Sequence, residues 1–287
     1  MSLKLDCRQL KKEELLKLKE KIKKEALQPV LAIIQVGSVD ASNIYIRNKR
    51  KAADEIGIAT TLCSFPEDVC QEQLLQKIDE LNIDPNVNGI FIQLPIPAHL
   101  DEAELINRID PKKDVDGLTT MNLGNLVSGK PLLTPCTPNA VMDILEQLNC
   151  DITGKKVVII GRSRLVGKPL FHLLLQKDAT ITLCHSKTEN LKEYTLNADI
   201  LITAAGTKKN LITADMVKED AIIIDVSIIR DEQNKLHGDV DYETVKEKVT
   251  YVTPVPGGVG QLTVLELMKN TVQAQEIQKQ YTLTKKR

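Results

Sequence analysis

The chain has 287 residues, of which 42% are hydrophobic and 27% are charged. This composition excludes an intrinsically disordered protein, and the length suggests two domains. Lys and Arg number 38 against 39 Asp and Glu, so the formal net charge is −1. A chain so close to neutrality lacks the basic field that a polyphosphate partner requires, and nucleic-acid binding is not expected.

The cysteines, the histidines and the N-terminus point to a cytoplasmic protein without a metal. The six cysteines are scattered and form no CxxC pair, which favours reduced thiols. The four histidines form no HExxH motif and no cluster at ligand spacing, so no metal site is expected. The N-terminal segment lacks the layout of a signal peptide, and no apolar run approaches the ~20 residues that span a bilayer. We therefore expect no membrane partner.

The N-terminal half of the chain alternates between helix and strand patterns. Apolar residues from Leu15 to Ala26 recur every three or four positions, which indicates an amphipathic helix. Short runs rich in β-branched residues predict strands at 30–36, 58–64 and 89–94, and the stretches between them predict helices at about 42–56 and 71–81. This βαβαβ order predicts a parallel sheet.

A second alternation follows residues 110–135, which are rich in Pro, Gly, Asp and Asn and which we interpret as a loop that connects two domains. Thr137 and Pro138 have the pattern of an N-cap and a first helical turn, and this helix is expected to continue to about Asn149. Strands are then expected at 157–160, 180–184, 199–203 and 221–226 with a helix between each pair, and a last helix at about 263–280. The predicted fold class is α/β with two domains.

A lysine lies within an apolar stripe of the expected helix at 42–56. Tyr45, Lys49, Ala52 and Ile56 are spaced so that they share one helix face. In one interpretation the lysine extends to water at the edge of the sheet. In the other, lost hydration disfavours its charged form, so that it exchanges protons near neutral pH, and Tyr45 offers a flat surface to an aromatic ligand.

Two further polar residues end expected strands or loops. Gln93 lies at the end of the strand at 89–94, before a proline-rich exit, where ligands of open α/β sheets bind. It is either a hydrogen-bond partner of Lys49 or a solvated side chain. Asp116 precedes Gly117 and forms either an ordinary Asp-Gly turn or an acceptor for the amino and ring N–H groups of a ligand.

The glycine loop Gly161–Pro169 follows an expected strand and opens a helix, so its backbone amides and the helix dipole can hold a phosphate. Its spacing matches neither a Walker loop nor GxGxxG. NAD-binding units carry an acidic residue at the end of the second strand, about 20 positions on. Ser186 and Lys187 stand there instead, which favours the 2′-phosphate of NADP, and Arg162 and Arg164 add positive charge.

The segment Thr253–Thr263 has three glycines between prolines and a helix N-cap. An ordinary turn does not need three glycines, which allow backbone conformations that other residues rarely adopt. We therefore expect this loop to approach a ligand closely.

Taken in order, these motifs resemble the bifunctional methylenetetrahydrofolate dehydrogenase/methenyltetrahydrofolate cyclohydrolase family. The resemblance runs from Val36–Lys49 to Pro256–Gly260 and covers nearly the whole chain. It implies an N-terminal α/β catalytic domain at 1–136 plus 263–287, a Rossmann-like NADP-binding domain with a parallel sheet at 137–262, a folate cleft at their junction, and a homodimer. The implied activity is NADP-dependent oxidation of 5,10-methylenetetrahydrofolate to 5,10-methenyltetrahydrofolate, followed by hydrolysis to 10-formyltetrahydrofolate. This tetrahydrofolate interconversion would supply purine biosynthesis.

The resemblance also implies roles for single residues. Lys49 would be the catalytic lysine, Tyr45 would pack on the pterin or its reacting carbon, Gln93 would orient Lys49, and Asp116 would anchor the amino-pyrimidine edge. All four are thereby implied as catalytic residues, and Tyr45, Gln93 and Asp116 also as substrate-binding residues. Further substrate contacts are implied for Pro256, Gly257 and Gly258, and an NADP site for Gly161, Arg162, Ser163, Ser186 and Ile228.

The sequence departs from the family pattern at three places. Ser227 stands where glycine is usual, and its side chain is expected to crowd the nicotinamide side of the cofactor. Gln261 and Leu262 replace Pro-Met, and Cys7 stands at a position that is usually glycine. The first two departures bear on cofactor preference and on the balance of the two activities.

Three other functions stay open at this point. A dehydrogenase without cyclohydrolase activity that uses NAD is disfavoured by Ser186 and Lys187. A folate- or nucleotide-binding protein without turnover is disfavoured by the intact set around Lys49. An enzyme of the shikimate dehydrogenase type, which also places a lysine and an aspartate between two α/β domains, is disfavoured by the Tyr45–Lys49 spacing and by the Pro-Gly-Gly-Val-Gly loop.

Overall fold

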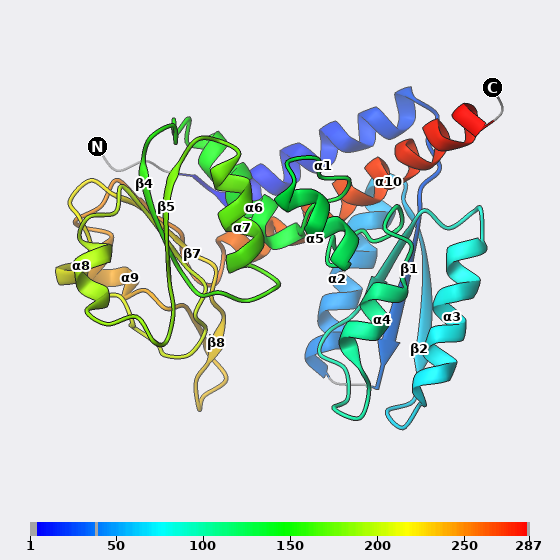
Figure 1. The fold of residues 1–287 in the computed structure, drawn as a ribbon, viewed down its shortest axis with the longest axis horizontal. Coiled ribbons are helices and arrows are strands. Elements are labelled where there is room, and N and C mark those ends of the chain that lie inside the picture. Colours follow the sequence, from blue (N-terminus) through cyan, green and yellow to red (C-terminus); the bar gives the residue numbers. More distant parts are fainter. Residues whose placement is uncertain (1–4, 38–39, 286–287) are drawn as a thin grey trace. The chain divides into compact units, whose positions relative to one another are not determined.

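A computed structural model describes residues 5–37 and 40–285 of the chain, which form two compact units (Figure 1). We name them after Lys49 and the glycine loop: the lysine unit comprises Lys12–Cys136 and Val264–Arg287, and the glycine-loop unit comprises Met1–Lys11 and Thr137–Thr263. The chain passes from one unit to the other within three helices, α1 (Cys7–Lys24), α6 (Cys136–Gln147) and α10 (Thr263–Lys285). The start of α1 groups with the glycine-loop unit, whereas the sequence-based assignment places it in the first domain.

The lysine unit is built on a three-stranded parallel sheet with the strand order β2-β1-β3. Its strands are β1 (Val30–Val36), β2 (Ala59–Phe65) and β3 (Gly89–Ile92), and its crossover helices are α2 (Asp40–Ile56) and α3 (Gln71–Ile83). Parallel neighbours require crossovers of this kind. All five elements were expected from the sequence, and only their ends differ by a few residues.

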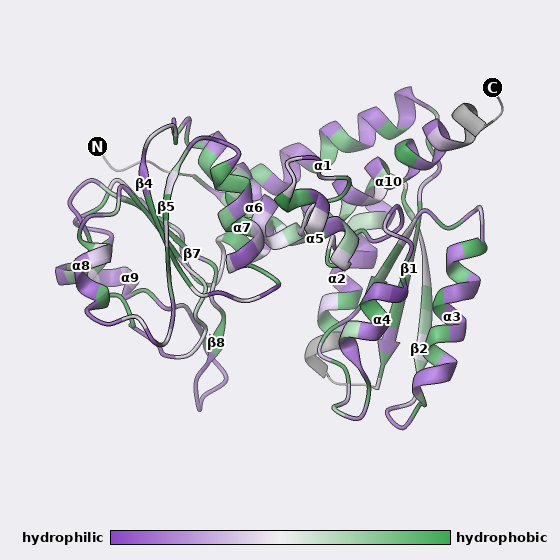
Figure 2. Cartoon of the chain, viewed as in Figure 1, coloured by the Kyte–Doolittle hydropathy of each residue, from purple (hydrophilic) through white to green (hydrophobic). Residues whose placement is uncertain are grey.

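Helices α3 and α4 (Glu102–Arg108) supply one side of the core of the lysine unit. Side chains alternate along a strand, so Ile34 of β1 points to these helices and Ile33 to the opposite face. Leu74 and Ile78 of α3 and Leu105 of α4 pack in the same cluster as Ile34. Figure 2 shows the resulting alternation of hydrophobic and hydrophilic bands along α3. The carboxyl ends of β1 and β3 are thereby held on a rigid support.

The interpretation of residues 110–135 as loop was partly wrong, because this segment contains the helix α5 (Thr120–Val127). The Thr119 hydroxyl accepts a hydrogen bond from the Asn122 backbone N–H and caps this helix. The buried Asp114 carboxylate accepts from the Thr119 N–H and from the Asn122 side chain, both at 2.8 Å. These local side-chain bonds outweigh the loop-forming composition of the segment.

The glycine-loop unit contains a five-stranded parallel sheet with the order β10-β7-β6-β4-β5. Its strands are β4 (Lys156–Ile160), β5 (Thr180–Cys184), β6 (Ile200–Thr203), β7 (Ile222–Asp225) and β10 (Tyr251–Val252), and its further helices are α7 (Gly167–Leu175), α8 (Leu191–Thr195) and α9 (Tyr242–Val245). The chain lays β5 on one side of β4 and then places β6 on the other. The strand order therefore reverses at the carboxyl ends of β4 and β6, which is where open α/β sheets bind ligands.

One expectation for this unit was wrong, and one hairpin was not predicted. The helix expected between β6 and β7 is only a 3₁₀ turn, η1 (Ala214–Met216). The polar stretch before it contains Asn210 at a positive φ of 55°, and Ile212 forms a β-bridge with Val240. Neither conformation is compatible with a continuous α-helix at these positions. A short antiparallel hairpin of β8 (Ile229–Arg230) and β9 (Leu236–His237) was not expected, because strands of two residues carry no periodicity.

Within 5–37 and 40–285, no helix is both long and apolar enough to cross a membrane. The same residues contain no group of three His, Cys, Asp or Glu side chains that could hold a metal ion. All six cysteines are free thiols.

Candidate active site

A lysine from α2 and a glutamine that follows β3 meet at the carboxyl edge of the three-stranded sheet. The Lys49 Nζ donates a hydrogen bond of 2.8 Å to Gln93 Oε1. The Gln93 Nε2 donates in turn to the Leu94 carbonyl at 2.6 Å, which fixes the orientation of the amide. The Lys49 Nζ also lies 3.9 Å from the centroid of the Phe91 ring. The amine is thus held on one polar atom and one aromatic face.

Burial lowers the pKa of Lys49 from its ordinary value of 10.5 to about 8. Lost hydration is the main cause, and the negative charge of Asp116 opposes it. The residue keeps some exposed surface, yet its charged end is enclosed by protein atoms. This environment supports the interpretation of Lys49 as a group that exchanges protons near neutral pH, rather than as a lysine that extends into water.

Asp116 is the second titratable group of the site. Burial raises its pKa from 3.8 to about 6, while the charge of Lys49 and a hydrogen bond with the Cys136 thiol oppose the rise. The residue also lies in the turn that its sequence suggests, because Gly117 has a φ of 70° and its N–H donates to the Asp114 carbonyl at 3.0 Å. The two interpretations of Asp116 are therefore compatible.

The expected stripe on α2 is apolar only in its second half. Ala52 and Ile56 are buried, with exposed fractions of 4% and 3%, whereas Tyr45 is 40% exposed. Tyr45 lies one helical turn before Lys49 and is not part of the core. Its exposed ring remains available to a ligand.

Sequence reasoning missed two residues beside Asp116. The buried Cys136 thiol donates its one S–H to the Val115 carbonyl at 3.3 Å and also interacts with Asp116, and burial keeps the pKa of Cys136 well above 9.0. Asn270 of α10 donates to the same Val115 carbonyl. A scattered cysteine gave no signal for Cys136. The contact of Asn270 spans 155 positions, which no local pattern reports.

The remaining candidates lie in the glycine-loop unit, where β4 leads into the glycine loop. Gly161 has a φ of 122°, and a Cβ there would collide with the Ala204 carbonyl at the end of β6. A Cβ at Gly167 would in turn collide with the Gly161 carbonyl. Both glycines are therefore required by backbone packing at the reversal of the strand order, before any ligand is considered.

Polar and cationic side chains surround this point on the exposed ends of β4 and β5. Arg162 and Ser163 are exposed after β4, and the Ser163 hydroxyl accepts a 3.1 Å hydrogen bond from the Val166 N–H at the entrance to α7. Ser186 and Lys187 are exposed in the turn after β5. A helix that begins beside two positive side chains and two hydroxyls can hold the phosphates of a dinucleotide.

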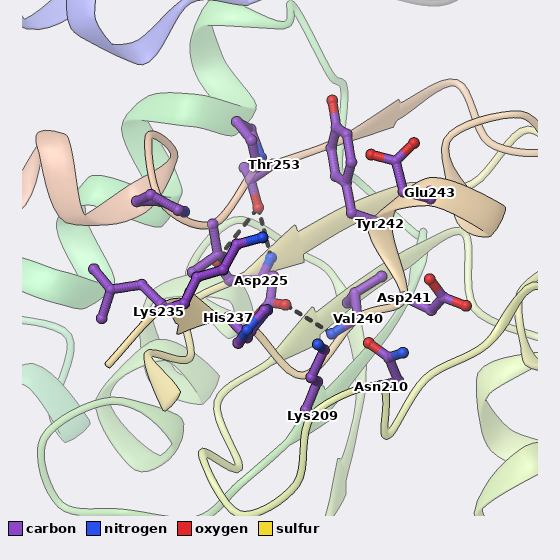
Figure 3. A pocket seen from close by; sticks show the side chains of 15 residues that line it. Lys209, Asn210, Asp225, Lys235, His237, Val240, Asp241, Tyr242, Glu243 and Thr253 are labelled. Carbon is purple, nitrogen blue, oxygen red and sulfur yellow. Dashed lines mark hydrogen bonds between the residues drawn. The ribbon is translucent and has the colours of Figure 1, made fainter. Parts of the chain in front are cut away.

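Asp225, at the end of β7, bonds to the segments after β9 and β10 through its buried carboxylate and its backbone N–H, respectively. The Asp225 carboxylate accepts from the Val240 N–H at 2.8 Å, and the Asp225 N–H donates to the Thr253 hydroxyl at 2.7 Å, as the dashed lines in Figure 3 show. Burial raises the pKa of Asp225 to about 6. A pocket of about 540 Å³ lies at this place, with Pro254 and Pro256 in its wall. Figure 3 shows this pocket from close by. The loop that carries Pro256, Gly257 and Gly258 is thus tied to the sheet at Thr253.

The Ser227 side chain is buried and bonded within the glycine-loop unit. Its side chain is 5% exposed, and its hydroxyl donates to the Asp239 carboxylate at 2.5 Å and accepts from the Gly206 N–H at 3.1 Å. Both hydrogen bonds of the hydroxyl are therefore made within the protein. The next residue, Ile228, is 49% exposed.

Comparison with known proteins agrees with both parts of this description. Residues 5–116 match the model of the tetrahydrofolate dehydrogenase/cyclohydrolase catalytic domain, and residues 135–279 match that of the NAD(P)-binding domain of the same family. The chain belongs to the tetrahydrofolate dehydrogenase/cyclohydrolase family. Both matched regions together span most of its length, and the fold class expected from the sequence is confirmed.

Individual relatives cover nearly the whole chain. The bifunctional protein FolD of Bacillus cytotoxicus is 48% identical over 263 residues, which are 92% of this chain and 90% of that protein. The crystal structure of the bifunctional enzyme FolD from Campylobacter jejuni is similar with a TM-score of 0.92 at 42% identity, and covers 95% of this chain and 98% of its own. The Trypanosoma brucei FolD structure, complexed with NADP and an inhibitor, has a TM-score of 0.90 at 33% identity over 96% of this chain and 98% of its own.

The geometry of the lysine unit predicts a coupled titration. We expect Lys49 of the wild-type protein to titrate with a pKa of about 8 in NMR of ¹⁵N-lysine-labelled protein. In Asp116→Asn the pKa of Lys49 should fall further, because the variant removes the negative charge that favours the ammonium form. A Lys49 pKa near 10.5 in the wild type, or one that rises in Asp116→Asn, would contradict this account.

Proposed function

We propose that the chain oxidises 5,10-methylenetetrahydrofolate to 5,10-methenyltetrahydrofolate with NADP and then hydrolyses the product to 10-formyltetrahydrofolate. The observation that carries the proposal is the buried Lys49 amine, with a pKa of about 8, on Gln93 Oε1. Family membership and the reported bifunctional relatives support the same pair of reactions. A lysine with this pKa holds both protonation states near neutral pH, as a residue that moves protons must.

The hydrolytic step needs one proton acceptor and one proton donor. As water attacks the methenyl carbon, neutral Lys49 accepts a proton from the water oxygen. The resulting ammonium then gives that proton to the folate N5 as the bond between N5 and the carbon breaks, and the second water proton leaves to solvent as the formyl C=O forms. Gln93 positions the amine by accepting its hydrogen bond, so that the Nζ lone pair has one direction.

Asp116 and Tyr45 bind the substrate in this proposal. The Asp116 carboxylate is mainly ionised above its pKa of about 6, and accepts hydrogen bonds from the amino and ring N–H groups of the pterin. Its negative charge also raises the pKa of Lys49, so that binding and proton transfer are linked. The exposed Tyr45 ring offers a stacking surface one helical turn away.

The glycine-loop unit would hold the dinucleotide. NADP supplies a hydride acceptor when it is bound. The Gly161 backbone and the start of α7 suit its phosphates, Arg162, Ser163 and Ser186 suit the 2′-phosphate and ribose, and the exposed Ile228 suits an aromatic ring. By resemblance, Pro256, Gly257 and Gly258 would contact the folate. The residues present therefore fit the cofactor.

The proposal includes a homodimer in the cytoplasm. Family resemblance supports the dimer, and six free thiols support a reducing compartment.

The first test replaces the lysine. Lys49→Met keeps the length and apolar stem of the side chain but removes the amine, so hydrolysis of methenyltetrahydrofolate should fall by about 10² to 10⁴. NADPH formation and methenyl absorbance are followed separately, with circular dichroism to verify folding. Lys51→Met is the matched control, because Lys51 lies on the same helix and is exposed. Near-normal methenyl hydrolysis in Lys49→Met would contradict the proposal.

The second test removes the carboxylate. Asp116→Ala should weaken binding of the folate substrate by about 1.5–3 kcal/mol, because charged hydrogen bonds to the amino-pyrimidine edge are lost. Isothermal calorimetry measures the change, and Asp54→Ala on the exposed face of α2 serves as the control. Unchanged affinity in Asp116→Ala would exclude this role.

The third test concerns the dinucleotide. Initial rates should favour NADP over NAD in the wild type, and Ser186→Asp should shift the preference toward NAD because its carboxylate repels a 2′-phosphate. Ser128→Asp, an exposed change in the lysine unit, controls for the added charge. A wild type that prefers NAD, or a preference that Ser186→Asp leaves unchanged, would be evidence against this assignment.

A further inference from the structure

A single buried carboxamide on the last helix holds both segments that form the Asp116 side of the site. Asn270 of α10 is 2% exposed, and its Nδ2 donates to the Val115 carbonyl and to the Thr134 carbonyl, each at 2.8 Å. A primary amide has two N–H hydrogens, so both are used. The Cys136 Sγ lies 3.7 Å from the same nitrogen.

The two carbonyls that accept hydrogen bonds from Asn270 are close in sequence to Asp116 and Cys136. Val115 directly precedes Asp116, and Thr134 lies two residues before Cys136, whose thiol interacts with Asp116. Between them, Gly117 brings the backbones together, since a Cβ there would lie 2.7 Å from Pro135 N. The Asp116 segment and the Cys136 segment are therefore packed backbone to backbone, with the Asn270 amide across both.

We propose that Asn270 is a positioning residue that sets the place of the Asp116 carboxylate and thereby the affinity for the folate substrate. The inference rests on the proposed role of Asp116 in binding that substrate. Without the amide, the Val115 and Thr134 carbonyls lose their shared donor in a buried place, and the weak S–H donor of Cys136 is left to hold the peptide before Asp116. A small rotation of that peptide moves the carboxylate away from the ligand.

The same helix offers a matched comparison. Gln278 of α10 also donates twice to backbone carbonyls, to Asn88 at 2.8 Å and to Lys112 at 3.1 Å. Lys112 lies four residues before Asp116 and is separated from it by the buried Lys113 and Asp114. If the paired hydrogen bonds from the α10 side-chain amides contribute only to stability, substitutions of Asn270 and Gln278 should have the same effect on the folate KM.

Charged side chains lie near Asn270 on α10 and act on the neighbouring Cys136. Glu266 lies one helical turn earlier on α10, is 3% exposed and pairs with Lys269 at 2.8 Å. It acts electrostatically on Cys136, as do Asp116 and Lys49. Asn270→Asp would add another negative charge to this group, so the neutral variant Asn270→Leu is the better test.

The experiment compares Asn270→Leu, Gln278→Leu, Asp116→Ala and the double variant Asn270→Leu/Asp116→Ala in the full-length chain. KM and kcat are measured with 5,10-methylenetetrahydrofolate at saturating NADP, together with the thermal unfolding midpoint. We expect Asn270→Leu to raise the folate KM about tenfold, which corresponds to a loss of about 1.4 kcal/mol, and to leave kcat within about twofold. In the Asp116→Ala background the same substitution should change KM little, because coupled residues are not additive.

Three outcomes decide the matter. An Asn270→Leu variant that loses stability but keeps its KM, as Gln278→Leu should, overturns the inference, and so do additive effects in the double variant. A KM that is unchanged in Asp116→Ala itself overturns the proposed role of Asp116 instead. Should Asn270→Leu fail to fold, Asn270→Ser, which retains one smaller donor, replaces it with the same expected split between KM and kcat.

Discussion

An amine that leaves water for a protein interior must either lose its proton or find compensation, and the lysine unit is organised around that constraint. Lys49 lies against the Phe91 ring with Gln93 as its hydrogen-bond acceptor. Gln93 is a neutral acceptor, so it orients the amine without stabilising the ammonium as a carboxylate would. The opposing charge comes from Asp116. Burial moves the two pKa values toward each other, to about 8 and about 6, which leaves the pair responsive near neutral pH.

Rigidity of the support makes this arrangement possible. β1 is buried along nearly its whole length, and Gln93 directly follows the neighbouring strand β3. The Asp116 turn follows a single β-bridge between Asp114 and Ile90 of β3. It is held by Gly117, which permits direct backbone contact with Pro135, and by the Asn270 amide from the far end of the chain. The Lys49 side of the site thus depends on the sheet, and the Asp116 side depends on both the sheet and α10.

Much of this follows from the sequence, and the exceptions have physical causes. The helical spacing around Lys49 and the strand end before Gln93 mark both residues as candidates, and contact between them is one of two interpretations of Gln93, since ligands of open α/β sheets bind at the carboxyl ends of strands. Side-chain bonds that cap a short helix, as at Thr119, are invisible to composition, and α5 was therefore missed. The orientation of the Ser227 hydroxyl depends on Asp239, twelve positions away, and that of Asn270 on still more distant carbonyls. The sequence therefore suggests which residues form the site, but not the distant hydrogen-bond partners of Ser227 and Asn270.

The central claim is that a partly neutral Lys49 moves protons during hydrolysis. The pH dependence of methenyltetrahydrofolate hydrolysis, corrected for the uncatalysed rate, tests it most directly in the wild type and in Lys49→Met. The account predicts that the catalysed rate rises through an apparent pKa of about 8, as the amine becomes neutral, and that this rise is absent without the lysine. A catalysed rate that does not change through that range, or the same rise in Lys49→Met, would contradict it.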